Sequence, residues 1–117
     1  MRYMFLVYSV EKAVNPAELG SVAEQHRRVM AEAAEKGILE KAEPLKPTGM
    51  ATTVRAHDGK PLIVDGPFAE TKEQLAGYYI LKCRDLDEAI DWAKKIPTGC
   101  KGGEGSIEIR PLEDIPH

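Results

Sequence analysis

The sequence has few cysteines, few aromatic residues, and no long run of apolar residues or of one charge. Its two cysteines, Cys83 and Cys100, form no CxxC pair and cannot by themselves staple a chain of 117 residues. We therefore expect reduced thiols and a cytoplasmic protein. No segment approaches the ~20 consecutive apolar residues that a membrane-spanning helix needs. The sequence thus argues against a membrane protein.

The charges are nearly balanced, with 16 basic and 19 acidic residues and a formal net charge of −3. A nucleic-acid-binding protein usually carries a basic patch, so no nucleic-acid partner is expected. Hydrophobic residues make up 43% of the chain and charged residues 30%, which is typical of a globular protein. The length predicts a single domain over residues 1–117.

Two segments have the spacing and end signals of helices. The first is predicted to start at about Pro16, after an N-cap at Asn15, and to end near Gly37. The second starts at about Leu86, after an N-cap at Asp85. An apolar stripe runs along the first helix from Leu19 to Ala33. The inward positions of the second helix are predicted to be Leu86, Ala89, Ile90 and Ala93.

Strands are predicted between and around these helices. Asp58 and Gly59 form a dipeptide favoured in tight primed turns, so the segment around them is a predicted hairpin. The N-terminal apolar run lacks a following small-residue cleavage site, which favours a first strand over a signal peptide. The other predicted strands are 39–45, 77–83 and 106–110, the last with only one buried face.

The order of these elements predicts an α+β fold. Two helices separated by strands suggest a split βαβ, ferredoxin-like antiparallel sheet of at least four strands, with both helices on one face. A chain of this length cannot easily cover the other face of the sheet. We therefore expect a second copy of the chain to cover that face, giving a homodimer.

The stretch "DGPFAETKEQLAGYYIL", residues 65–81, begins with turn residues and ends in an apolar strand. It resembles the central motif of the DGPF-type branch of the YCII-related proteins. The segments "IEIRPL" (107–112) and "LDEAIDWAKKIP" (86–97) resemble the closing strand and second helix of that family.

This resemblance implies a ferredoxin-like fold whose subunits pack sheet to sheet into a dimeric α/β barrel, with a small-molecule pocket beside each sheet. Many members of the family have no assigned activity, and some related genes accompany extracytoplasmic-function sigma factors. A better understood branch removes chloride from chlorinated hydroquinones with a histidine and an acidic partner. That histidine lies on the first helix, about three turns before a glycine, and His26 stands eleven residues before Gly37.

His26 is the candidate general base, with Asp65 as the carboxylate that orients it. The alternative is a hydrogen-bonded core histidine, because His26 lies on the apolar stripe. Asp65 and Gly66 have an alternative too, as a simple turn. The other histidines, His57 and His117, lie in a turn and at the terminus, so no metal site is expected.

Further candidate pocket residues follow Asp65. If "TKEQ" forms one helical turn, the charged residues Glu70, Lys72 and Glu73 could instead be ordinary solvated side chains. They could also form a local Glu–Lys network that pins the loop. Tyr78 and Tyr79 alternate across the sheet, so one of them should face the helices, and their hydroxyls could donate hydrogen bonds to a phenolic or carboxylate ligand. These candidates are Phe68, Glu70, Lys72, Glu73, Tyr78 and Tyr79.

Three functions remain open from the sequence. The first is a general acid–base enzyme that acts on a small, aromatic compound. The second is a non-catalytic module that binds a ligand or accompanies a sigma factor, and the third is an interaction module. The glycines of "GCKGGEG" do not follow a strand and open a helix, so no phosphate-binding loop or cofactor is indicated.

Overall fold

The structure is a computed structural model that describes residues 1–11, 16–98 and 104–115. Asn15, Cys100 and His117 lie outside these residues, as does the side chain of Leu19. The elements follow in the order β1 (Arg2–Ser9), α1 (Pro16–Glu35), β2 (Leu39–Pro44), the 3-10 turn η2 (Thr48–Met50), β3 (Thr52–His57), β4 (Lys60–Asp65), β5 (Gln74–Lys82), α2 (Leu86–Ala93) and β6 (Gly105–Pro111).

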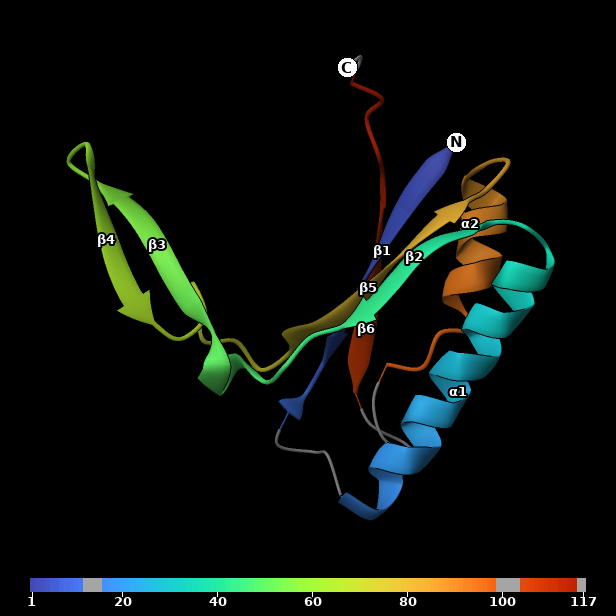
Figure 1. The fold of residues 1–117 in the computed structure, drawn as a ribbon, viewed down its shortest axis with the longest axis horizontal. Coiled ribbons are helices and arrows are strands. Elements are labelled where there is room, and N and C mark those ends of the chain that lie inside the picture. Colours follow the sequence, from blue (N-terminus) through green and yellow to red (C-terminus); the bar gives the residue numbers. More distant parts are fainter. Residues whose placement is uncertain (12–15, 99–103, 116–117) are drawn as a thin grey trace.

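Four of the strands form one antiparallel sheet in the order β2-β5-β1-β6. This order, with α1 between β1 and β2 and α2 between β5 and β6, confirms the predicted α+β fold and is consistent with a ferredoxin-like arrangement. Within the described residues the sheet is open and forms no closed barrel. Figure 1 shows the sheet nearly edge-on, with both helices on one side of it. Neither described helix has the length and apolarity that crossing a membrane requires.

The core lies between the sheet and the helices. Alternate residues of β1 are buried, as expected for a strand with one covered face, and the side chains of Phe5 and Leu81 are fully buried. Burial of large side chains of this kind supplies most of the stabilisation, at roughly 25 cal/mol per Å² of apolar surface. The core residues are Tyr3, Phe5, Val7, Val29, Ala33, Tyr79, Leu81, Cys83, Ala89, Trp92 and Ile96.

Local signals set the helix ends as predicted. Gly37 has a φ of 73°, and the N–H of Ile38 donates to the carbonyl of Ala33 at 3.0 Å, as in a Schellman C-cap. Asp85 caps α2 by accepting a hydrogen bond from the backbone N–H of Glu88 at 2.9 Å.

The predicted inward face of α2 is partly wrong. Ala89 is fully buried, but Leu86 and Ile90 are 52% and 37% exposed. Trp92 takes their place in the core and is only 5% exposed. An indole ring buries more apolar area than either aliphatic side chain, so the helix turns that side to the sheet.

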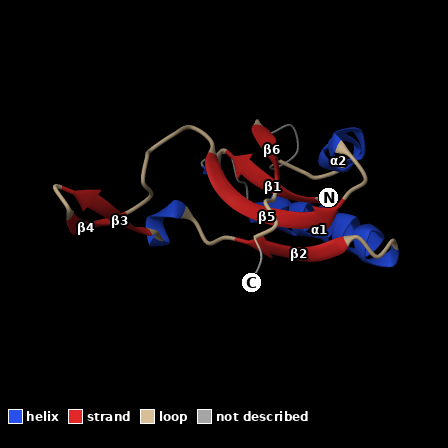
Figure 2. Ribbon diagram, turned by 90° about the horizontal axis from the view of Figure 1, so that it is seen from above, coloured by secondary structure: helices blue, strands red, loops and turns tan. Residues whose placement is uncertain are grey.

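Strands β3 and β4 form the predicted hairpin, but it stands apart from the main sheet as a separate two-stranded sheet. Asp58 and Gly59 have φ values of 48° and 75°, as a type I′ turn requires. In Figures 1 and 2 this hairpin projects away from the body of the molecule.

The segment between β4 and β5 is an irregular loop, so the prediction of a helical turn at "TKEQ" is wrong. The side-chain amide of Gln74 donates to the carbonyls of Ala69 and Thr71, and the Thr71 hydroxyl donates to the carbonyl of Glu73. These side-chain bonds satisfy the backbone locally and compete with helix formation.

Candidate functional site

A cavity of about 260 Å³ lies between the first half of α1 and the edge of the sheet formed by β2 and β5. Helix α1 contacts the core with Val29 and Ala33, whereas Ala23 and Arg27, nearer its start, remain exposed at the rim of the cavity. The helix therefore packs against the core through its second half, and the space beside its first half is the cavity. Its apolar lining includes Val7, Ala23, Met30, Ala42, Pro44 and Ala76.

Gly77 lets strand β2 approach closely enough to form one wall. A Cβ at this position would lie 2.9 Å from the carbonyl oxygen of Glu43 and 3.3 Å from the Cα of Pro44. The missing side chain thus brings Glu43 and Pro44 to the cavity, where both contribute to its lining.

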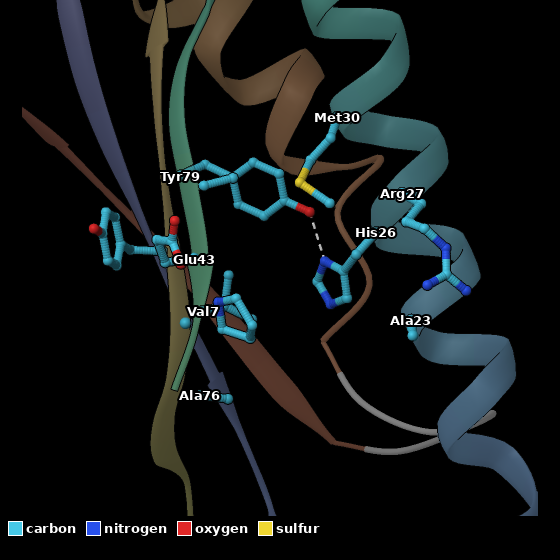
Figure 3. Close-up of a pocket in the computed structure, with 12 residues that line it drawn as sticks. Val7, Ala23, His26, Arg27, Met30, Glu43, Ala76 and Tyr79 are labelled. Atoms are coloured by element: carbon cyan, nitrogen blue, oxygen red, sulfur yellow. Dashed lines mark hydrogen bonds between the residues drawn. The ribbon is translucent and has the colours of Figure 1, made fainter. Parts of the chain in front are cut away.

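A histidine–tyrosine pair forms the polar centre of this cavity. Nδ1 of His26 lies 2.6 Å from the hydroxyl oxygen of Tyr79, and the two rings are tilted by 30° with centroids 5.8 Å apart. Figure 3 shows His26 pointing from α1 towards the sheet and Tyr79 pointing from β5 towards the helix, with Met30 beside the hydroxyl. Nε2 of His26 has no hydrogen-bond partner among the residues that the structure describes.

Burial determines the protonation state of both groups. It lowers the pKa of His26 below its usual value near 6.5. It also raises the pKa of Tyr79 to about 12. At neutral pH the pair therefore consists of a neutral imidazole and a protonated phenol, joined by a short hydrogen bond.

The structure does not bring Asp65 and His26 together. Asp65 ends β4, where it pairs with Thr52 in the hairpin, and it does not line the cavity. The carboxylate that the sequence suggested is replaced by the phenol of Tyr79. The strand alternation that placed one tyrosine towards the helices was the signal available in the sequence.

The turn interpretation of Asp65 and Gly66 agrees with the geometry. Gly66 has a φ of 106°, its N–H donates to the carbonyl of Ala51 at 2.7 Å, and its own carbonyl accepts from the Thr53 hydroxyl at 2.7 Å. A left-handed φ of this size favours glycine. These residues close the base of the hairpin.

Most of the other predicted pocket residues lie in the loop after the hairpin and away from the cavity lining. Phe68 is 74% exposed, and its carbonyl accepts from Arg55. Lys72 forms an ion pair with Glu104 at 2.6 Å, and Glu73 accepts from the Ser106 hydroxyl at 2.8 Å.

The paired charges therefore pin the loop to the start of β6, while Glu70 is exposed. Of the predicted pocket residues, Tyr78 and Tyr79 contribute to the lining, but only Tyr79 points from β5 towards the helix, and the side chain of Tyr78 points to the other face of the sheet. Arg27 and Glu43 also line it and were not singled out from the sequence. The described residues contain no cluster of three or more histidine, cysteine or carboxylate side chains that could hold a metal ion.

The lowered pKa of His26 predicts that the protein loses stability as the pH falls. The unfolded histidine binds a proton near pH 6.5, whereas the buried one binds it only at lower pH. Stability is therefore fully present above about pH 6.5 and declines as the pH falls towards the folded pKa. Thermal melts between pH 7 and pH 5 should show this decline in the wild type and a weaker one in His26→Gln.

His57 provides the matched control, because it is exposed at the hairpin turn. His57→Gln should keep the pH dependence of the wild type. An unchanged pH dependence in His26→Gln would show that burial of this imidazole contributes nothing to it. The range stops at pH 5 because carboxylates in ion pairs, such as Glu32 and Glu40, lose their charge at lower pH.

Comparison with known proteins gives the family of the chain. A family model, the YCII-related domain, matches residues 1–115. A protein of Rhizobium meliloti (strain 1021), described as uncharacterised, is 40% identical over 115 residues, which cover 96% of this chain and 92% of that protein. The match extends from β1 through the last described strand. The chain therefore belongs to the family of YCII-related domain proteins.

Proposed function

We propose that the protein is a cytoplasmic homodimer of the DGPF-type branch and that the cavity at His26 and Tyr79 binds a small molecule. The single observation that carries this proposal is a hydrogen-bonded His–Tyr pair inside an otherwise mainly apolar cavity. Ligand sites commonly combine apolar walls with a few convergent polar groups. The motif "DGPFAETKEQ" supports the branch.

The cavity selects for a small ligand with one polar group on an apolar body. Its volume of about 260 Å³ lies just below the ~300 to 1,000 Å³ of typical drug-sized sites. A compound with a single ring and one hydroxyl or carbonyl group suits this size. The thioether of Met30 adds an adaptable contact for a ring.

The pair offers the ligand a hydrogen bond in either tautomer of His26. If Nδ1–H donates to the oxygen of Tyr79, then Nε2 accepts from the ligand and the Tyr79 hydroxyl is free to donate. If the hydroxyl of Tyr79 donates to Nδ1, then Nε2–H donates to the ligand. A hydroxylated ligand fits both cases because a hydroxyl group both donates and accepts.

General acid–base catalysis at the same cavity is the second candidate. The observation in its favour is that the imidazole is neutral near pH 7 and has Nε2 without a described partner, as a general base requires. A phenol orients an imidazole less strongly than a carboxylate does, since it carries no charge. The geometry therefore supports ligand binding more directly than catalysis.

Two substitutions on α1 test the site by filling it or leaving it open. Ala23 lines the cavity, so Ala23→Trp should fill its mouth, whereas Ala31→Trp places the same side chain on an exposed position of the same helix. With 4-chlorophenol as the probe, we expect NMR shifts at the backbone amides of Ala42, Ala76 and Gly77 in the wild type and in Ala31→Trp. Ala23→Trp should remove them.

The polar pair should contribute measurably to the affinity for this probe. Loss of one neutral hydrogen bond costs about 1 kcal/mol, so His26→Gln or Tyr79→Phe should weaken binding by about fivefold. Equal shifts in Ala23→Trp and the wild type would show that the probe binds elsewhere and contradict the proposed site.

A further inference from the structure

The hairpin of β3 and β4, residues 52–65 and here called the arm, has one continuous apolar face. Val54 pairs directly with Ile63, and Ala56 pairs with Pro61, so these four side chains share a face. Val54 is 66% exposed and Ile63 is 71% exposed. A face of this composition is normally covered in a folded protein.

The arm is held firmly at its base although the rest of it is uncovered. The carboxylate of Glu11 accepts from both the N–H and the hydroxyl of Thr48, each at 2.8 Å. These bonds fix η2, which leads directly into β3. No residue of β3 or β4 is buried. A lone two-stranded hairpin is at best marginally stable in water, so a fixed base suggests an arm positioned for a partner.

The arm stands on the open side of the sheet. In Figure 1 the helices lie to the right of the sheet and the arm lies to its left. The radius of gyration is 15.9 Å, against about 13 Å for a compact chain of this length. A body that docks on the face of the sheet opposite the helices would therefore lie next to the arm.

That open face carries apolar side chains as well. Leu6 of β1 lies opposite Tyr78 of β5, and Met4 lies opposite Ile80. All four are only partly buried and alternate with the core residues of their strands, so they lie on the side away from the helices. No described helix covers them.

We propose that the arm clasps a second copy of this chain, with its face of Val54, Ala56, Pro61 and Ile63 packed on the partner. This inference rests on the proposed sheet-to-sheet homodimer and names the element that completes it. Both surfaces are on the same chain, so two arms dock reciprocally about one two-fold axis and the assembly closes. The apolar face of each arm is then covered.

The area of the sheet supports a role for the arm. A four-stranded face of this length has a projected area on the order of 400 Å². A stable interface usually buries about 800 Å² of accessible surface on each partner. The sheet face alone is therefore a small interface. The arm extends the contact around the partner and adds apolar side chains that would otherwise face water.

Sedimentation velocity over a dilution series tests the clasp with three kinds of variant. The double variant Val54→Asp/Ile63→Asp places charges on the apolar face of the arm. Leu62→Asp is the matched control, because Leu62 is 48% exposed on the opposite face of the same hairpin. Leu6→Asp instead places a charge on the open face of the sheet and tests the dimer itself.

The sedimentation of the wild type should correspond to a mass of twice 12.9 kDa. The double variant should raise the dimer dissociation constant at least tenfold with little change in melting temperature, while Leu62→Asp should stay within about twofold of the wild type. A double variant that dimerises as tightly as the wild type, while Leu6→Asp dissociates, would overturn the clasp and leave the sheet-to-sheet dimer standing. A wild type that is monomeric at every concentration would overturn both.

Discussion

Replacing Gly105 by alanine should lower the melting temperature by roughly 10 °C or more. A Cβ at this position would lie 2.5 Å from both the Cβ and the carbonyl oxygen of Thr98, and 2.6 Å from the carbonyl oxygen of Tyr8. Two of these atoms belong to the backbone, so relief requires β6 to shift away from β1. Overpacking of this kind costs about 3 kcal/mol, which circular dichroism melts would measure directly.

Gly20→Ala is the control for the methyl group itself. Gly20 lies within α1 and is exposed, and a Cβ at this position would meet nothing within 4 Å outside its own helix. Alanine there should raise stability by about 0.5 to 1 kcal/mol, because it favours the helix over the unfolded chain. If Gly105→Ala melts as the wild type does, then β6 does not press against Thr98 in the way the structure describes.

The predictable parts of the fold are those that local chemistry decides. The type I′ turn at Asp58 and Gly59, the C-cap at Gly37 and the N-cap at Asp85 each follow from a few neighbouring residues. The alternation of isoleucine with polar residues likewise predicted that the last strand has one covered face, and Ile107 and Ile109 do pack against the core. These signals depend little on what the rest of the chain does.

The unpredicted parts depend on contacts between distant segments. Helical spacing alone predicted that Leu86 and Ile90 face the core. In the structure Trp92 fills that space, and both aliphatic side chains are exposed. The loop "TKEQ" has capping-box spacing, yet the side chain of Gln74 bonds to loop carbonyls instead. The hairpin was predicted, but its separation from the main sheet was not. Whether a hairpin joins another sheet depends on contacts with distant strands, which leave no local pattern in the sequence.

The candidate site shows the same division. The apolar stripe of the first helix placed His26 towards the sheet, and strand alternation placed one tyrosine towards the helices. Which polar group reaches the imidazole depends on how α1 is positioned along β5, and the sequence alone does not show that position. Asp65 belongs to the motif that resembles the DGPF-type branch, but it pairs with Thr52 at the base of the hairpin, in the separate two-stranded sheet.

The sequence predicted Asp65 as the partner of His26, whereas the structure places Tyr79 there. Three substitutions therefore test whether this site is catalytic. If the cavity supports acid–base turnover of chlorinated or hydroxylated aromatic compounds, His26→Gln should reduce kcat/KM by about 10²- to 10⁴-fold. Tyr79→Phe should also reduce it, because the imidazole loses the group that orients Nδ1. Asp65→Asn should leave it unchanged, since Asp65 does not line the cavity.

The pattern across these variants separates the roles that the histidine could have. Equal losses in His26→Gln and Asp65→Asn would mean that the carboxylate reaches the imidazole in the working protein, contrary to its position at the base of the hairpin. Turnover that survives His26→Gln, together with a lower melting temperature, would make the histidine part of the scaffold. A loss in His26→Gln and Tyr79→Phe alone would assign proton transfer to this pair, because these two groups meet inside the cavity at 2.6 Å.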